Sequence, residues 1–234
     1  MPIQESRWAI LQHLKRQGSA TVESLSQALH LAPMTVRQHL AVLERDNVIA
    51  SHTVRHGPGR PAFQYTLTAS GQELFPKSYD KLAVRLLQEV TMLESDEIAL
   101  LAGREKVSLV FNKMADRMAT EYGQEIEGDT LETRVGVLVD LLQEREGTLT
   151  EWAPSDNGIE ILDYNCPFQK IVSLEPELCS WHVRFLSGAL GTDVKMEESI
   201  AEGHSCCRYR VQPISTATTI QTIQSQSFEP ASPS

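Results

Sequence analysis

Apolar residues recur at every third or fourth position in three stretches near the start of the chain, and this spacing indicates amphipathic helices. We expect these helices over residues 3–17, 22–29 and 33–46. Thr21 offers a hydroxyl that can cap the second helix, and Pro33 suits the first position of the third, where no backbone N–H is needed. Two strands are expected over residues 52–56 and 62–67, around the turn from Gly57 to Pro61. This order of elements predicts a winged helix-turn-helix.

The helical spacing continues in the middle of the chain, and an alternating pattern replaces it after Gly147. The middle helices are expected over residues 70–91, 96–121 and 130–146. Pro76 lies inside the first of them and should kink or restart it. A short helix should include Cys179 and Phe185. The later strands are expected over residues 148–153, 159–164, 193–200 and 206–212.

These patterns predict an α+β protein with four parts. The expected parts are a winged helix-turn-helix DNA-binding domain (1–75), a helical linker and dimerisation region (76–146), a small α+β cysteine-containing sensor domain (147–212) and a disordered tail (213–234). The tail is rich in Ser, Thr, Gln and Pro, a composition that cannot bury a core. The apolar faces of the middle helices exceed what the small first domain can cover. We therefore expect a homodimer, whose two-fold symmetry would match a palindromic double-stranded DNA operator.

The net charge of −10 is unevenly distributed along the chain. Residues 1–90 carry a slight excess of Lys and Arg, whereas the remainder is strongly acidic. This asymmetry predicts that the first part meets nucleic acid and that the acidic part lies away from the phosphates. No stretch approaches the roughly 20 apolar residues of a membrane-spanning helix. The first five residues also lack the basic and apolar regions of a secretory signal, so a cytoplasmic protein is expected.

The third predicted helix is the candidate for reading DNA. Its apolar positions Val36, Leu40 and Leu43 should face inward, which leaves the intervening polar residues outside. Arg can pair with guanine and Gln with adenine in bidentate fashion, and arginines beside the turn of the two strands can reach a minor groove or phosphates. The candidate DNA contacts are Thr35, Arg37, Gln38, His39, Arg55 and Arg60.

Four cysteines lie in the C-terminal third, at positions Cys166, Cys179, Cys206 and Cys207. Twelve residues separate the first from the second and 27 separate the second from the last, so these are not the close pairs of a zinc finger. A reducing cytoplasm disfavours disulfides, which leaves metal binding, redox chemistry or a plain role as buried apolar residues. Adjacent residues on a strand point to opposite faces, so Cys206 and Cys207 should not be equivalent ligands.

Residues 6–75 resemble the winged-helix domains of the DeoR and ArsR-like regulators. The turn from Gly57 to Pro61, followed by Tyr65-Thr66-Leu67-Thr68 and Gly71, is similar to the wing and following helix of the SufR family. The similarity extends through the middle helices into the cysteine region. SufR proteins repress genes for iron–sulfur cluster assembly, and the resemblance implies that the cluster-loaded protein is the repressing form.

The resemblance further implies that Cys166, Cys179 and Cys207 hold an iron–sulfur cluster, either 2Fe-2S or 4Fe-4S, because such clusters are bound mainly by Cys thiolates. Some members carry another cysteine between the second and the last, and Asp193 lies near that place here. The fourth ligand therefore stays open, with a small exogenous thiol as one option. The candidates within the chain are Cys206, Asp193, His204 and His182.

Two other interpretations remain. In one, the C-terminal domain of a winged-helix regulator senses zinc, thiol redox state or a small organic ligand; zinc shares Cys and His ligands with iron–sulfur clusters. In the other, Cys206 and His204 act as nucleophile and base of an enzyme. The sequence supplies no oriented triad and no Gly-rich phosphate loop, so we do not expect an enzyme.

Overall fold

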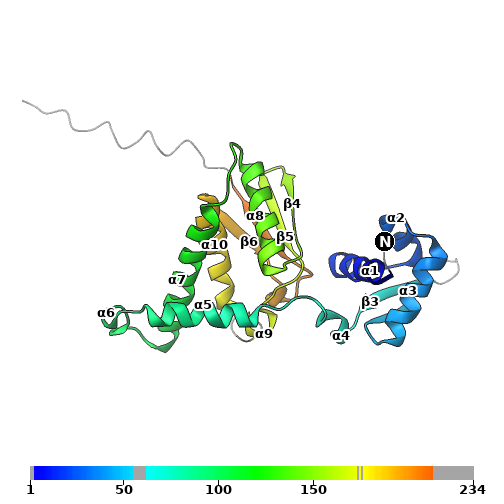
Figure 1. The fold of residues 1–234 in the computed structure, drawn as a ribbon, viewed down its shortest axis with the longest axis horizontal. Helices are drawn as coiled ribbons and strands as arrows, with labels where there is room; N and C mark the ends of the chain where they lie inside the picture. The colour runs from blue at the N-terminus through cyan, green and yellow to red at the C-terminus, as the bar shows by residue number, and fades with distance from the viewer. Residues whose placement is uncertain (1–2, 55–61, 173, 175, 213–234) are drawn as a thin grey trace, which may run out of the picture.

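The computed structural model describes residues 3–54, 62–172, 174 and 176–212. Figure 1 shows an N-terminal body that contains α1 to α3, and a larger C-terminal body that contains α5, α7, α8, α10 and a sheet. The segment after α4 joins the two bodies. This confirms the predicted α+β fold with an N-terminal winged helix-turn-helix. The proposed tail, residues 213–234, lies outside the described residues.

Three helices and a small antiparallel sheet form the N-terminal body. Its elements are α1 (Ile3–Gln17), β1 (Ser19–Ala20), α2 (Val22–Leu29), α3 (Pro33–Arg45), β2 (Ile49–Val54) and β3 (Ala62–Leu67), with the strands in the order β1-β3-β2. The Thr21 hydroxyl accepts a hydrogen bond from the Ser24 backbone N–H, which confirms the predicted cap. The pattern missed β1, because two residues are too few to show alternation.

Two of the predicted middle helices are each divided. The observed elements are α4 (Ala69–Gln72), α5 (Tyr79–Thr91), α6 (Ser95–Ile98), α7 (Gly103–Gly123) and α8 (Leu131–Glu146). The restart predicted at Pro76 within residues 70–91 is confirmed: the helix stops at Gln72, and Ser78 is the N-cap position of α5. The helix expected over 96–121 also begins again at Gly103, where the Glu105 carboxylate accepts the Ala102 backbone N–H at 2.7 Å.

An antiparallel four-stranded sheet and several helices complete the chain. They are β4 (Thr150–Ser155), β5 (Gly158–Asp163), α9 (Gln169–Val172), the 3-10 helix η1 (Pro176–Cys179), α10 (Ser180–Leu190), β6 (Val194–Glu198), η2 (Ile200–Glu202) and β7 (Cys207–Val211). The strand order is β4-β5-β7-β6. The pattern missed the short helices α9 and η2, whose single turns carry too few residues for a periodic signal.

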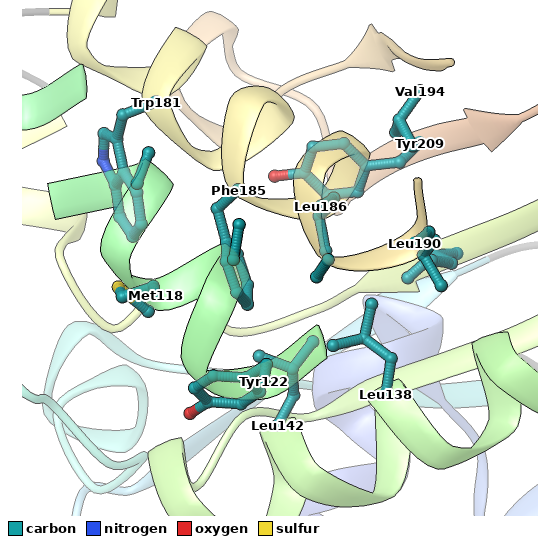
Figure 2. Packing of buried hydrophobic residues seen from close by; sticks show 14 of the residues in the cluster. Met118, Tyr122, Leu138, Leu142, Trp181, Phe185, Leu186, Leu190, Val194 and Tyr209 are labelled. Atoms are coloured by element: carbon teal, nitrogen blue, oxygen red, sulfur yellow. The ribbon is translucent and has the colours of Figure 1, made fainter. Parts of the chain in front are cut away.

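The C-terminal body has the larger of two cores. Its buried side chains come mainly from α7, α8, α10 and the sheet, and Figure 2 shows Tyr122, Leu138 and Phe185 among them. The Tyr122 and Phe185 rings meet edge to face with centroids 5.2 Å apart. None of the described helices is long and apolar enough to cross a membrane.

The smaller core, within the N-terminal body, is completed by residues from outside it. Phe75, from the segment after α4, packs beside Trp8 with ring centroids 5.1 Å apart. Leu149, which precedes β4, is buried in the same core, and Tyr164 packs against it. The two bodies therefore share an apolar contact in addition to the segment that joins them.

Candidate functional site

Helix α3 has the expected inward stripe, with Val36, Leu40 and Leu43 all buried. Arg37 and Gln38 are exposed and Thr35 is half-buried. The Arg37 guanidinium lies 3.8 Å from the Glu23 carboxylate in a largely exposed pair, which is weak enough to exchange for a DNA contact. The start of α3 therefore presents an Arg and a Gln side chain to the solvent.

His39 was expected on the outer face of α3, and this prediction is wrong because only 8% of the residue is exposed. It follows Val36 by three positions and precedes Leu43 by four, so it belongs to the inward stripe. Burial lowers the pKa of His39, and the nearby Arg7 charge lowers it further. A neutral imidazole in that place packs against the body of the domain.

Two exposed apolar side chains of the DNA-binding domain were not predicted as DNA contacts. Met34, next to Pro33 at the start of α3, and Phe63 in β3 are both exposed. An apolar side chain at the start of a recognition helix can contact a thymine methyl group. The one signal in the sequence was that Met34 falls outside the inward stripe. Arg55 and Arg60 lie outside the described residues.

A cavity of about 50 Å³ lies inside the C-terminal body, and it brings together three of the four cysteines. Cys166 comes from the loop after β5, Cys179 from the end of η1 and Cys207 from the start of β7. Helices α5, α7, α8 and α10 supply most of the other lining side chains, which are largely apolar. Residues that lie far apart in the sequence thus line one cavity.

Each cysteine is held by its own local structure. The Phe168 backbone N–H donates to the Cys166 thiol, and the Ile200 backbone N–H donates to Cys207 Sγ at 3.4 Å. Burial raises the pKa of Cys166 to about 12 and that of Cys207 to about 11, and it also raises the pKa of Cys179. All three are neutral thiols at pH 7, so a bound metal would have to displace their protons.

The structure separates the two adjacent cysteines. Cys207 lines the cavity, whereas Cys206 is buried outside it, with its Sγ 4.0 Å from the Glu198 carboxylate. Cys206 precedes β7 and Cys207 is the first residue of that strand, so the pleat directs their side chains differently. Variants of Cys206 and Cys207 can therefore show whether a bound group depends on a thiol inside the cavity.

The candidates for a fourth ligand also differ in place. His182, on α10, lines the cavity, and burial lowers its pKa to about 4, while its Nδ1 lies 2.9 Å from the Tyr209 hydroxyl. Asp193 is exposed beside Lys195, at 3.7 Å. The exposed His204 has Nδ1 3.2 Å from the Ser199 carbonyl oxygen. Among the four, His182 alone is in the cavity lining.

The side chains that face the cavity include the donor types that bind metals and clusters. Three thiols and one imidazole face the cavity, and this is the ligand chemistry of iron–sulfur clusters and of zinc. Among the described residues, no three His, Cys, Asp or Glu side chains are close enough together to hold a metal ion as they stand. The ligand types therefore fit, and binding one centre would require the side chains to come closer.

Sequence analysis missed two buried carboxyl groups in the cavity lining, Glu146, which is paired with Arg85 at 2.9 Å, and Asp163. Asp163 ends β5, and burial raises its pKa to about 7. Its Oδ1 accepts a hydrogen bond from the Asn165 backbone N–H at 3.1 Å, and the positive charge of Lys15 lies near enough to oppose the shift. Lys15 belongs to α1, so a charge of the N-terminal body acts on a carboxyl group in the cavity lining.

A family model described as winged helix-turn-helix DNA-binding matches residues 3–50. These residues include α1, α2 and α3, the elements that build the exposed surface around Arg37. The N-terminal body is thus a winged helix-turn-helix DNA-binding domain, and the chain is a DNA-binding protein of the winged-helix class. No curated protein matches the chain.

Two solved structures show a limited similarity. One is a transcriptional regulator homologue from Pyrococcus horikoshii OT3, 23% identical over 37% of this chain and 83% of that chain, with a TM-score of 0.27. The other is Bacillus subtilis PadR in complex with operator DNA, 17% identical over 62% of this chain and 94% of that chain, with a TM-score of 0.29. Both TM-scores are too low for these structures to bear on how this chain is arranged.

Proposed function

We propose that this protein is a transcriptional regulator that binds an operator through its winged helix and senses an iron–sulfur cluster through its C-terminal body. The observation that carries the proposal is the cavity: Cys166, Cys179 and Cys207 line it, and Cys206 does not. Buried neutral thiols are poor nucleophiles, which argues against thiol catalysis, and a metal would bind them only by displacing their protons.

In this proposal, the three cysteines bind the cluster as thiolates, and His182 or a small exogenous thiol completes the ligand set. The bound cluster would supply a group that assembles and decays with iron supply and oxidation. The chain itself holds the three sulfurs on separate elements and places apolar side chains such as Phe168 and Trp181 beside them in the cavity lining. Zinc is the alternative metal for the same donors.

At the DNA, Arg37 and Gln38 are proposed to read base edges in the major groove, with Thr35 beside them. Arg55 and Arg60, in the wing, are proposed to contact phosphates or a minor groove. From the resemblance to the SufR family, we propose that the cluster-loaded form represses genes for iron–sulfur cluster assembly. A cytoplasmic location is part of the same proposal.

We also propose that the protein acts as a homodimer on a palindromic operator. Leu82 and Glu89 of α5 are buried, whereas Val84, Leu87 and Val90 form an exposed apolar stripe on the other side of the helix. Helix α5 directly follows the segment that leads out of the DNA-binding domain, so pairing two copies there would fix the spacing of two such domains. Sedimentation should show a dimer, and Leu87→Glu should shift it toward monomer while Leu174→Glu does not.

The cluster is tested by isolating the protein without oxygen. We expect a brown protein that contains iron and acid-labile sulfide and loses both in air. The variants Cys166→Ser, Cys179→Ser and Cys207→Ser should each remove the absorption bands, whereas Cys206→Ser, the matched control, should keep them. Loss of the cluster should also change operator affinity in a gel-shift titration. A colourless wild-type protein that carries stoichiometric zinc would show that the cluster assignment is wrong.

A second candidate is a regulator whose cavity binds a small organic ligand. Most of the lining is apolar, and Met114, Met118 and Phe185 are adaptable or aromatic side chains on which such ligands pack. The cavity of about 50 Å³ would have to expand to hold one, because small-molecule pockets usually measure about 300–1,000 Å³. If this candidate is right, the three cysteine variants should leave the regulation of operator binding intact.

A further inference from the structure

The loop that carries Cys166 is hydrogen-bonded to the segment that leads out of the DNA-binding domain. The Asn165 Nδ2 atom donates to the Pro76 carbonyl oxygen at 2.9 Å, and the Pro167 carbonyl oxygen accepts the Ser78 backbone N–H at 3.3 Å. The residues on both sides of Cys166 thus bind residues 76 and 78. In Figure 1, α9, which follows this loop, lies beside the start of α5, where the Lys170 backbone N–H donates to the Tyr79 hydroxyl at 3.1 Å.

The linking segment is short and is anchored at both of its ends. At one end, Phe75 is buried in the core of the DNA-binding domain. At the other end, the Ser78 hydroxyl donates to the Glu146 carbonyl oxygen at 3.2 Å, and the Ser78 carbonyl oxygen accepts the Leu82 backbone N–H in the first turn of α5. A displacement of residues 76–78 therefore has to move either the DNA-binding domain or α5.

Asn165 is the best-defined contact between the two segments. It is fully buried, and its backbone N–H donates to Asp163, so the loop itself orients the side chain toward Pro76. Its Oδ1 is buried without a hydrogen-bond partner in the described part of the chain. An unpaired buried oxygen is unfavourable, so the present arrangement of the loop leaves one polar group of Asn165 unsatisfied.

We infer that Asn165 is a positioning residue that transmits the state of Cys166 to the DNA-binding domain through the Pro76 carbonyl. The inference rests on the proposed function and deepens it. When Cys166 changes from a buried thiol to a ligand, its sulfur must approach the other two, and the loop from 165 to 167 moves with it. Because the loop holds residues 76 and 78, that movement changes how the DNA-binding domain is oriented relative to α5.

The test measures operator affinity for protein reconstituted with ferrous iron and sulfide and for the same protein stripped of them. The ratio of the two affinities reports the coupling, typically about 5–150-fold. Asn165→Ala should keep the absorption spectrum and iron content but reduce the ratio about fivefold, the change expected for one hydrogen bond of about 1 kcal/mol. Glu151→Gln is the matched control: it removes the ion pair of Arg16 with Glu151, an inter-body contact outside the loop, and should leave the ratio unchanged.

Hydrogen–deuterium exchange gives a second readout that does not depend on DNA. In wild-type protein and in Glu151→Gln, reconstitution should change the exchange of the peptide that contains Ser78, and in Asn165→Ala this change should disappear. The milder Asn165→Ser, whose hydroxyl is too short to span to Pro76, should behave likewise if the alanine variant does not fold. If a folded Asn165 variant keeps the same ratio of operator affinities as the wild type, the inference is wrong and the proposed function is unaffected. If the wild-type protein binds the operator equally well in its reconstituted and stripped forms, both the inference and cluster control are wrong.

Discussion

The DNA-binding domain and the cysteine cavity differ in how their functional residues are brought together. In the domain, Arg37 and Gln38 are neighbours on one helix, and a local pattern of apolar positions decides which way they face. In the cavity, Cys166 and Cys207 are 41 positions apart, and the sheet register that pairs Asp163 with Cys207 brings their segments together. A local site can be inferred from periodicity, whereas a site of this second kind depends on the tertiary fold.

The largest expected effect tests whether the two bodies unfold independently of each other. Phe185→Ala removes a fully buried ring between α7 and α10, which should destabilise the C-terminal body by about 3–5 kcal/mol. The N-terminal body should keep most of its stability, because its own core lies in a different cluster. Denaturant titration monitored by peptide-resolved hydrogen exchange would measure both. An equal loss in the two bodies would show that the shared contact at Leu149 makes them one cooperative unit.

The same difference between local sites and sites that depend on the tertiary fold decides what could be predicted from the sequence. The inward stripe on α3 and the cap at Thr21 could be predicted because each depends on residues within one or two turns. His39 could also have been placed correctly from its spacing to Val36 and Leu43, but its polarity suggested an outer position. Asp163 and Asn165 could not be predicted, because their roles depend on burial and on Pro76, 89 positions away from Asn165.

The second prediction concerns the pH dependence that Asp163 gives the cavity. Its pKa is raised from 3.8 to about 7, so the folded state holds the proton more tightly than the unfolded chain does. The proton bound to Asp163 stabilises the folded state fully below pH 4. This stabilisation is lost as the pH rises to about 7, and the loss in the free energy of unfolding is at most about 4 kcal/mol. In stripped protein, Asp163→Asn should therefore raise the melting temperature at pH 8 and change it little at pH 4. An equal change at both pH values would mean that Asp163 does not titrate in this way.

The third prediction tests the local site. Arg37→Ala or Gln38→Ala should change the preferred operator sequence, with a cost of about 1–3 kcal/mol at the matching base pair, because a good bidentate contact is lost. Arg45→Ala is the control: it also removes an exposed charge from α3, but at the far end of the helix, beside Asp46. Selection from random duplexes would reveal the preference. A uniform loss of affinity for all DNA would place these side chains on phosphates instead.

The smallest expected effect comes from the cap of α2. It tests whether a residue that stabilises the DNA-binding domain also contributes to DNA binding. Thr21→Ala removes the hydroxyl that accepts the Ser24 backbone N–H, which should cost about 0.5–2 kcal/mol of stability. Thr21→Ser keeps the acceptor oxygen and should restore most of the loss. Because α2 packs against α3, the cap also supports the surface around Arg37, so operator affinity should fall only when the domain begins to unfold. Thermal unfolding of both variants, followed by circular dichroism, gives the stability, and a gel shift at 25 °C gives the affinity. If Thr21→Ala weakened DNA binding in a fully folded protein, Thr21 itself would have to be added to the DNA contacts.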